Sequence, residues 1–522
     1  MQRICVCLSL TVLLATPAWA QLAGQTALVG TVTDRDGGIV PGAAVTAVNV
    51  NTKDTYETTT NAQGQYNIQF VRLGTYELTI TLAGFQTFKA TGVEVAGNQV
   101  VRTDAVLPVG GVAETVTVEA AAAVLATDRA AISQTVDQRA VANLPLSGRN
   151  VWQLASTTPG VLGGQTSDIG LTFRGAGQRD IQNSLTLDGI NSSSNLLAAT
   201  SMRPIAEAVS EVQVQTGSTS AEYGAYLGVH INVVTKSGTN QFHGAGFEYY
   251  QSDALDARGH FDNRANPKNP RERNQYGFQF DGPVVLPRLY DGRNKTFFMG
   301  AFEGIRSETR TSPIISVPTA RMRQGDFSEV AAQIRNPFTR ENLPTNQIPQ
   351  SMLSPTALRL LDYFPMPNRP GTAANYQGDA FDKDDADQVL LRVDQNLGNK
   401  IRLYARYNWH DSYNLLGSPI EVQSITQPRV NKNSLFSYTH TLLPNLHNDF
   451  RIGYHRIDFD TLNHFWVNNL AGVGAGLGIP GFDGDVQYGN LGIPSVGITA
   501  FSGLGQGART GTSSTRRSRC RT

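Results

Sequence analysis

Cysteine is scarce in this sequence of 522 residues, in which it occurs three times. Cys5 and Cys7 fall in the first twenty residues, and Cys520 lies close to the C-terminal end. If the first twenty residues are removed, one cysteine remains and no internal disulfide can form. The folded chain must then be held together by apolar burial and by hydrogen bonds within sheets.

Charge is also scarce, and neither sign dominates. Asp, Glu, Lys and Arg make up 16% of the chain, against roughly 25% in an average soluble domain, and the formal net charge is zero. This composition excludes a charge-rich disordered segment and argues against a nucleic-acid partner. The balance depends on an arginine-rich tail, without which the chain is net acidic: Arg509, Arg516, Arg517, Arg519 and Arg521.

Long apolar runs are missing after the first twenty residues. Those residues carry Arg3, an apolar stretch over residues 4–15, and the small-residue sequence Ala18-Trp19-Ala20. They are typical of a secretory signal peptide over residues 1–20, cleaved between Ala20 and Gln21. Since no later stretch approaches the ~18 apolar residues of a transmembrane helix, any membrane crossing would use the strands of a β-barrel.

Motifs for enzyme chemistry are missing as well. The histidines of the C-terminal half are too far apart for a compact metal site, and the glycine-rich residues 472–478 lack the dinucleotide fingerprint. The acidic run of Asp382, Asp384, Asp385 and Asp387 lacks the glycine and terminal glutamate of a calcium-binding EF-hand, so it is predicted to be a solvated loop. The sequence therefore predicts no catalytic residues, no metal and no cofactor.

Residues 24–108 alternate apolar and polar side chains in short runs, and about seven strands in so short a segment indicate a β-sandwich. The runs predicted as strands are residues 28–34, 44–50, 56–60, 65–70, 75–82 and 99–107. The segments Gly30-Thr31-Val32-Thr33-Asp34 and Gly74-Thr75-Tyr76-Glu77-Leu78 resemble the carboxypeptidase-regulatory-like domain. The resemblance implies a carbohydrate-binding-like fold over residues 21–109, with no peptidase chemistry and a structural spacer as the simplest role.

Residues 110–128 are predicted to be a linker that carries one extended segment. The segment consists of Glu114, Thr115, Val116, Thr117 and Val118. Such a run is either ordinary linker or a strand that waits for the edge of a partner's sheet. It resembles the TonB box of TonB-dependent transporters. The resemblance implies a TonB-type energy-coupling protein as a partner, which would pair with this segment by strand addition.

Residues 129–240 are predicted to form a small, polar α+β domain. Leu185 and Leu187 alternate into a turn, and Val212 and Val214 alternate with polar neighbours in a half-buried strand. The motif residues of this region are Arg174, Gly175, Asp188, Gly189, Glu222, Tyr223 and Gly224. Together these motifs resemble the plug domain of TonB-dependent transporters, in the branch that is called Oar-like.

Residues 241–508 alternate with a two-residue period over runs of about ten residues, as the strands of a membrane barrel do. In the run 400–411, apolar residues share one face while Arg402 and Arg406 share the other. The surface of a soluble sandwich also alternates, but inward arginines are costly in a dry core and tolerated in a water-filled lumen. The pattern favours a transmembrane barrel, whose other predicted strands are residues 244–251, 276–281, 296–303, 389–394, 435–442 and 449–454.

Two irregularities are predicted within this region. Alternation slips after Tyr454, because Ile457 and Phe459 change face, which predicts a bulge or the exit of the strand from the bilayer. The Pro- and Asn-rich residues 311–387 predict one long extracellular loop. The segment Asp281-Gly282-Pro283-Val284-Val285 resembles the barrel of the Oar-like proteins.

The predicted fold is mainly β, with an N-terminal β-sandwich, a small α+β plug domain and a partial transmembrane antiparallel β-barrel. The leading hypothesis is a receptor or transporter of the cell outer membrane that is TonB-dependent, contacts outer-membrane lipid and imports a large extracellular solute: a glycan, a peptide or an iron chelate. The alternative is a surface protein for carbohydrate binding or adhesion that is anchored by its barrel.

The number of strands predicts an incomplete barrel. Plugged transporters have about 22 strands, at roughly ten residues each plus turns and loops, whereas residues 241–522 supply about seven recognisable runs. We therefore expect a C-terminally truncated chain with an aberrant basic tail over residues 509–522, in which residues 511–522 show no strand pattern. Such a chain is expected not to transport unless further strands exist.

Overall fold

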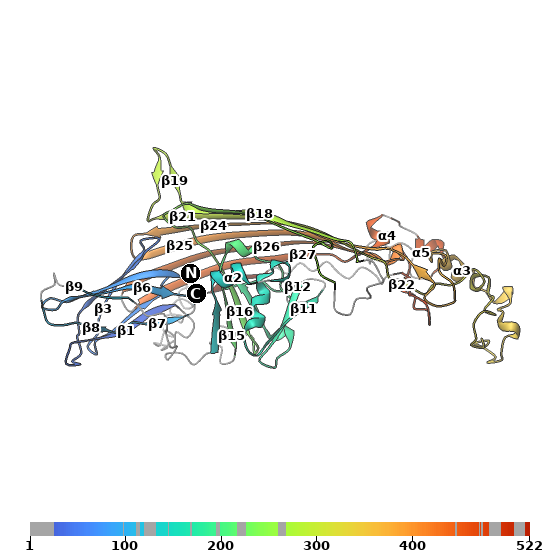
Figure 1. Ribbon diagram of the computed structural model, residues 1–522, viewed down its shortest axis with the longest axis horizontal. Helices are drawn as coiled ribbons and strands as arrows, with labels where there is room; N and C mark the ends of the chain where they lie inside the picture. Colours follow the sequence, from blue (N-terminus) through green and yellow to red (C-terminus); the bar gives the residue numbers. More distant parts are fainter. Residues whose placement is uncertain are drawn as a thin grey trace, which may run out of the picture.

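The computed structural model places an N-terminal sandwich, a middle domain and one long sheet side by side, and the sheet curves over the middle domain (Figure 1). The predicted cleavage residues Ala20 and Gln21 lie outside the described residues, as do Glu114 and the motif Glu222-Tyr223-Gly224. The structure describes residues 26–97, 99–110, 115–119, 132–144, 146–167, 170–194, 199–216, 226–258, 268–443, 446–468, 470, 473–479, 492–505 and 517–521.

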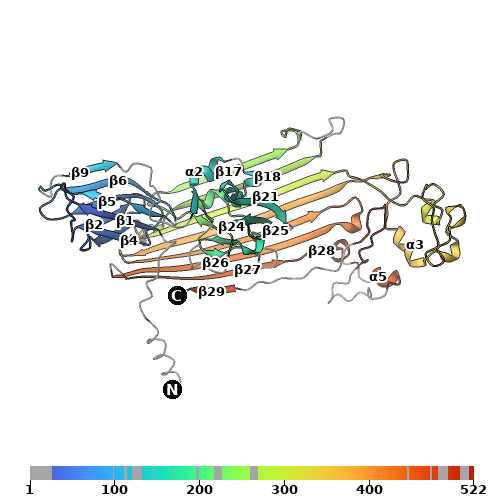
Figure 2. The same ribbon diagram turned by 90° about the horizontal axis from the view of Figure 1, so that it is seen from below.

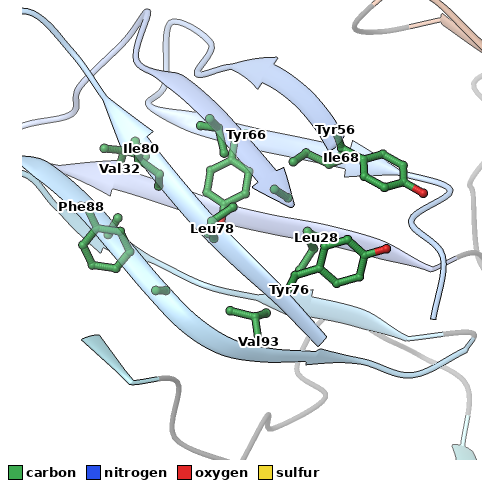
Figure 3. Packing of buried hydrophobic residues seen from close by; sticks show 14 of the residues in the cluster. Leu28, Val32, Tyr56, Tyr66, Ile68, Tyr76, Leu78, Ile80, Phe88 and Val93 are labelled. Atoms are coloured by element: carbon green, nitrogen blue, oxygen red, sulfur yellow. The ribbon is translucent and has the colours of Figure 1, made fainter. Parts of the chain in front are cut away.

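The sandwich consists of two sheets that enclose an apolar core (Figure 3). One sheet has the order β4-β1-β7 with β8 beside β1, and the other has the order β3-β2-β5-β6-β9. Alternate side chains of each strand are buried, as the two-residue period predicts. The strands are β1 (Ala27–Thr33), β2 (Ala44–Asn49), β3 (Thr55–Thr59), β4 (Gln65–Gln69), β5 (Gly74–Thr81), β6 (Thr87–Val95), β7 (Val100–Arg102), β8 (Ala105–Val106) and β9 (Thr115–Glu119).

Strand β6 was not among the predicted strands, and the reason is a bulge. Tyr76 pairs with Val93 and Leu78 with Ala90, so that two residues of β6 face one residue of β5. Gly92 lies in the bulge at φ +73°, a conformation that favours glycine. The bulge breaks the alternation that would have indicated a strand. The run predicted over residues 99–107 is likewise interrupted, and forms the two short strands β7 and β8.

The middle domain contains a five-stranded sheet of order β10-β15-β16-β13-β14, a separate hairpin β11-β12, and short helices. Its core is apolar and includes Trp152, whose indole Nε1–H donates to the carbonyl of Met202 at 2.8 Å. The predicted α+β character is confirmed. The elements are β10 (Ile132–Val136), α2 (Gln138–Asn143), η2 (Val151–Thr157), β11 (Val161–Ser167), β12 (Gly170–Gly175), β13 (Ser184–Leu187), β14 (Ile190–Asn191), η4 (Ala206–Ala208), β15 (Val209–Thr216) and β16 (His230–Thr235).

Strand β15 differs from its prediction as a half-buried strand. Val212 and Val214 are buried, but the polar Glu211, Gln213 and Gln215 are buried too. The polar face is covered by other parts of the chain. The Gly97 N–H of the sandwich donates to Glu211 Oε1 at 2.9 Å, and the Asn232 amide of β16 donates to Gln213 Oε1 at 3.1 Å.

The large sheet is antiparallel and has the order β17-β18-β21-β24-β25-β26-β27-β29, with β28 beside β26. Each predicted barrel strand lies inside one of these strands, except that the run 400–411 begins at Lys400, just before β25, and most of the strands are longer than predicted. Among the described residues, the two edges of the sheet do not meet. The strands are β17 (His243–Ser252), β18 (Arg271–Pro283), β21 (Thr296–Thr311), β24 (Ala380–Leu397), β25 (Ile401–Leu416), β26 (Ile425–Leu443), β27 (Leu446–Phe459), β28 (Leu462–Asn463) and β29 (Arg517–Arg521).

The two faces of this sheet have the predicted characters. Arg402 and Arg406 are buried on the face that covers the middle domain. On the opposite face, large apolar side chains are exposed, and they include Leu391, Tyr407 and Phe436. A sheet that is apolar outside and charged inside is what a strand wall in a membrane requires.

Two predictions about this region are wrong. Of the two explanations for the change of face after Tyr454, the bulge is excluded, and the exit of the strand from the bilayer stays a prediction. The register of β26 with β27 runs without a shift from Asp449 to Phe459, so there is no bulge after Tyr454, and Ile457 is buried on the inner face. Residues 517–521 form strand β29 on the edge of β27, because backbone groups can pair along an open edge without any side-chain alternation. The acidic run 382–387 belongs to β24 rather than to a loop.

The long loops gather at one end of the sheet, opposite to the sandwich (Figure 2). The loop between β21 and β24 spans residues 312–379 and shares an apolar core with residues 417–424 and with the segment after β27. Thr356 and Arg359 donate to backbone carbonyls of that last segment. The elements of these loops are β22 (Ile314–Ile315), α3 (Pro355–Leu361), β23 (Tyr376–Gln377), α4 (His464–Val467) and α5 (Val473–Gly476).

Within the part of the chain that the structure describes, none of the helices has the length and apolar character needed to cross a membrane.

Candidate functional site

A buried ion pair joins the middle domain to the wall of the large sheet. Asp188 Oδ2 lies 2.9 Å from Arg406 Nε, and the side chains are 3% and 0% exposed. Asp188 sits in the turn between β13 and β14 and also accepts hydrogen bonds from the Thr235 N–H and hydroxyl, at 2.8 and 2.9 Å. Arg406 donates to the Leu187 carbonyl and to Asn433 Oδ1. The pair is therefore desolvated and held by hydrogen bonds on both sides.

A second arginine of the wall lies beside the first. Arg392 of β24 is directly opposite Arg406 of β25 in the sheet register, and like charges in that position repel. Arg392 makes a bidentate pair with Asp394 at 2.8 and 2.9 Å. It also donates to the Thr235 carbonyl and hydroxyl at 2.9 and 3.0 Å. The wall thus supplies one carboxylate, that of Asp394, for its two arginines, and the middle domain supplies the second carboxylate, that of Asp188.

The sandwich joins the same network through Arg72. Its guanidinium lies 3.6 Å from Asp394 and 3.5 Å from Asp54, and it donates to Asn396 at 3.1 Å. Burial disfavours the charged guanidinium, but the carboxylates of Asp394 and Asp54 outweigh this effect and raise the pKa of Arg72. The guanidinium of Arg402 lies 3.8 Å from the ring centre of Tyr56, a favourable cation–π distance.

A separate set of charges ties the middle domain to the wall nearer to the long loops. Arg203 donates to Asp384 of β24 at 2.9 Å. Arg149 forms an ion pair with Glu207 and lies 4.0 Å from the ring centre of Tyr249 on β17. Burial disfavours the charge of Arg203, yet the Asp384 carboxylate raises the pKa of the guanidinium. The middle domain therefore contacts the wall through charged side chains at both of its ends.

A polar cavity of about 880 Å³ lies where the three parts meet. Its lining includes Arg72 of the sandwich, Gln213 and Lys236 of the middle domain, and Asp281 and Arg451 of the sheet. Burial lowers the pKa of Lys236. A cavity with such a lining can hold water or a polar solute.

The inner face of the wall also carries buried polar groups that have no hydrogen-bond partner among the described residues. They belong to neighbouring strands, and each side chain is at most 5% exposed. In native proteins such groups are usually satisfied by water or a ligand. The atoms are Gln388 Nε2 on β24, Asn408 Oδ1 and Ser412 Oγ on β25, and Asn431 Oδ1 on β26.

The described motif residues of the middle domain, namely Arg174, Gly175, Asp188 and Gly189, do not form one cluster. Asp188 and Gly189 lie at the junction with the wall, where Gly189 takes φ +82° in the predicted turn. Arg174 is exposed and pairs with Asp180 at 2.9 Å. Gly175 packs against Val229, and a Cβ at this position would lie 2.2 Å from Val229 Cγ1. These two residues thus hold the domain together rather than contact the wall.

Of the segment that resembles a TonB box, residues 115–118 lie in strand β9, which pairs in parallel with β6. Val116 is half-buried, and Thr117 and Val118 are exposed. No signal in the sequence indicated this pairing.

Several residues of the junction were not predicted, namely Asp54, Arg72, Thr235, Arg392 and Asp394. The last two carried a signal that could have been used. Arg392 and Asp394 are two residues apart in a predicted strand, so they share a face and can pair. Arg72 and Asp54 carried no such signal, because their partners on the wall are more than three hundred residues away in the chain.

Comparison with known proteins agrees with this architecture. Residues 234–519 match the outer membrane beta barrel domain, and residues 27–108 match the carboxypeptidase regulatory-like domain. The TonB-dependent transporter Oar of Myxococcus xanthus is 25% identical over 247 residues, which are 45% of this chain and 23% of that protein. The chain thus spans about a quarter of the length of this relative.

The solved structures to which this chain is similar include the outer membrane transporter YddB of Escherichia coli. It has 11% identity, a TM-score of 0.42, and coverage of 64% of this chain and 40% of that chain. The siderophore receptor PirA of Acinetobacter baumannii has 13% identity, a TM-score of 0.32, and coverage of 63% and 45%.

The matched barrel domain extends over more than half of the sequence, and it contains strands β17 to β28 of the curved sheet, which has charged side chains inside and apolar side chains outside. The chain belongs to the outer membrane beta barrel domain family, and it is a protein of the outer membrane with a carboxypeptidase regulatory-like domain in front of its barrel strands.

Proposed function

We propose that this chain acts as a TonB-dependent receptor or transporter that takes up a large polar solute, with the middle domain as the plug. The observation that carries the proposal is the junction of Asp188 with Arg406 and Arg392. The wall places two arginines side by side, and the second carboxylate that they need comes from the middle domain. A domain that completes the charges of a barrel wall fits the role of a plug at rest.

The contrast between the core of this domain and its outer contacts supports movement as a unit. The core is apolar, and the burial of its side chains away from water keeps the domain folded. The contacts with the wall include ion pairs and hydrogen bonds, beside one small apolar cluster in which Ile205 and Ala208 pack against β21 and β24. Water that enters the interface can hydrate the separated charges, so a buried ion pair is less secure than an apolar contact of the same size. The plug can therefore separate from the wall without unfolding.

The solute that fits this arrangement is hydrophilic. The inner wall carries amide atoms and a hydroxyl that have no partner among the described residues, at Gln388, Asn408, Ser412 and Asn431. The cavity at the junction is lined by charged and amide side chains. Groups of this kind favour water and hydrogen-bonding solutes over apolar ones. A glycan, a peptide and an iron chelate all meet this requirement.

The alternative of a carbohydrate-binding sandwich is less well supported. A sugar-binding surface usually offers exposed aromatic rings, but Tyr56, Tyr66, Tyr76 and Phe88 are at most 5% exposed and form part of the core.

Energy coupling in this proposal begins at the TonB-box segment. An energy-coupling protein would bind residues 114–118 through backbone hydrogen bonds. Val116→Pro removes a backbone donor and is expected to weaken capture of the chain by the purified C-terminal domain of a TonB-type protein at least tenfold. Val116→Thr keeps the donor and the β propensity, and should bind as the wild type does. Equal capture of the proline variant would refute the box assignment.

A further inference from the structure

Strand β9 uses the TonB-box segment to extend the sheet of the sandwich. Five residue pairs join it in parallel to β6, from Thr87 with Thr115 to Thr91 with Glu119. Residues 115–118 of the segment are thus already paired on one side. On its other side, β9 is the last strand of its sheet among the described residues.

The register of this pairing is set by the core of the sandwich. Phe88 and Ala90 point into the core and are at most 5% exposed, and their partners in the register are Val116 and Val118. The valines therefore continue the core-facing side, while Thr117 pairs with Lys89 on the outer side. A slip by one residue would place Thr117 against the core, so the valines favour the observed register.

This pairing is nevertheless easier to open than those between the inner strands of the sheet. Strand β9 has five residues, lies at an edge, and leaves Val118 43% exposed. Short edge strands with little apolar burial belong to the parts of a protein that open first. The β6–β9 pairing is therefore strong enough to occupy the segment and weak enough to be reversed.

Strand β6 is also connected to the middle domain. It ends at Val95, and two residues later the Gly97 N–H donates to Glu211 of β15 at 2.9 Å. A Cβ on Gly97 would lie 2.1 Å from Glu211 Oε1, so the two chains are in close contact. A displacement of β15 would thus act on the end of the strand that holds β9.

We infer that the sandwich is a holder for the TonB-box segment: β6 occupies β9 at rest, and an energy-coupling protein engages the segment after β9 has left β6. The inference rests on the proposed function, since it assumes that such a protein binds here. It assigns to the sandwich a regulatory role, in which its sheet edge competes with the edge of the coupling protein for one strand.

A reversible cross-link between the strands tests this inference. Lys89→Cys with Thr117→Cys, in a Cys520→Ser background, places two thiols on paired residues of the outer side. Oxidation should lower capture by the C-terminal domain of the coupling protein at least tenfold, and reduction should restore it. Capture of the oxidised form at the wild-type level would overturn the inference, because the coupling protein would then add to the free edge of β9.

Two controls separate this result from other causes. Thr46→Cys with Glu57→Cys links the paired strands β2 and β3, which locks the sandwich without touching β9, and its oxidation should leave capture unchanged. A free peptide of residues 112–120 reports on the proposed function itself. If neither the peptide nor the reduced chain binds, the proposed function fails. If both bind and the oxidised chain binds equally well, only the holder role fails.

Hydrogen exchange gives a second measurement that does not depend on the cysteines. In the wild-type chain with an excess of the coupling domain, amides of residues 87–91 that are directed to β9 should lose protection if the segment is transferred. Unchanged protection of these amides in the complex would contradict the inference.

Discussion

Asp188 and Arg406 form an ion pair, with 2.9 Å between Oδ2 and Nε, that is closed to solvent on both sides although one residue belongs to the middle domain and the other to the barrel wall. A buried charge without its partner is costly. Each residue thus depends on a domain to which it does not belong, and charged groups specify this part of the contact between the middle domain and the wall.

Removal of one partner of this pair should destabilise the chain strongly. Asp188→Leu leaves Arg406 beside Arg392 with one carboxylate between them, and the expected loss is about 3–5 kcal/mol in the free energy of unfolding. The double variant Asp188→Leu with Arg406→Met buries no uncompensated charge at this pair and should lose much less than the sum of the single variants. Denaturation of the four proteins in detergent gives the double-mutant cycle.

The matched control for this cycle is an exposed pair of the same domain. Arg174 pairs with Asp180 and is 62% exposed, so Arg174→Met should cost less than about 1 kcal/mol. Additive effects of Asp188→Leu and Arg406→Met would show that the two side chains do not act as a pair.

The contact between sandwich and middle domain should depend on pH through Glu211. Burial raises the pKa of this carboxyl, although hydrogen bonds from Gln213 and the Gly97 N–H lower it in part. The folded chain therefore keeps the proton to a higher pH than the unfolded chain, in which the pKa is about 4.3. The contribution of Glu211 to stability should therefore fall as the pH rises from about 4.3 through the raised pKa of this carboxyl in the folded chain.

A comparison of variants measures this effect. The free energy of unfolding of the wild type, minus that of Glu211→Gln, should decrease over this pH interval. The exposed Glu94 provides a control position, and Glu94→Gln should retain the dependence of the wild type. A wild type and a Glu211→Gln variant with parallel pH profiles would contradict the assignment.

Local patterns in the sequence were sufficient for most of the strands and their faces, but not for the partners across domains. The side of β25 that carries Arg402 and Arg406 follows from a two-residue period within a dozen residues. Their partners do not, because Asp188 and Tyr56 come from other domains. The same limit explains the acidic run of β24: Asp384 pairs with Arg203, 181 residues away, and without that partner the run has the composition of a loop.

Irregular backbone geometry accounts for most of the remaining differences between the predicted and the observed strands. The bulge at Gly92 hid strand β6, and with it the partner of β9. A glycine in a strand is compatible with a bulge, a turn or a close approach of two chains. The sequence alone does not decide among these possibilities.

Gly175 lies at such a close approach of two chains, and a substitution at this position is expected to destabilise the middle domain. A methyl group there would lie 2.2 Å from Cγ1 of the buried Val229, a stiff β-branched side chain. Gly175→Ala should therefore destabilise the middle domain by about 1–3 kcal/mol. Gly246→Ala is the control, because no heavy atom lies within 4 Å of a Cβ built at Gly246. Protease resistance of residues 132–235 measures the difference, and equal resistance of both variants would contradict the prediction.

Arg72 should decide whether the sandwich stays docked on the barrel. Its guanidinium is shared between Asp54 of the sandwich and Asp394 of the wall, so Arg72→Leu removes the cation that holds two carboxylates together. The expected result is a sandwich that folds but separates from the wall, seen as faster hydrogen exchange at residues 52–56 with unchanged exchange in the core strand β5. Arg102→Leu is the matched control, since Arg102 is 40% exposed and pairs with an exposed aspartate of the same domain. If Arg72→Leu and Arg102→Leu exchange alike at residues 52–56, docking depends on the remaining contacts, of which the stacking of Arg402 on Tyr56 is the most direct.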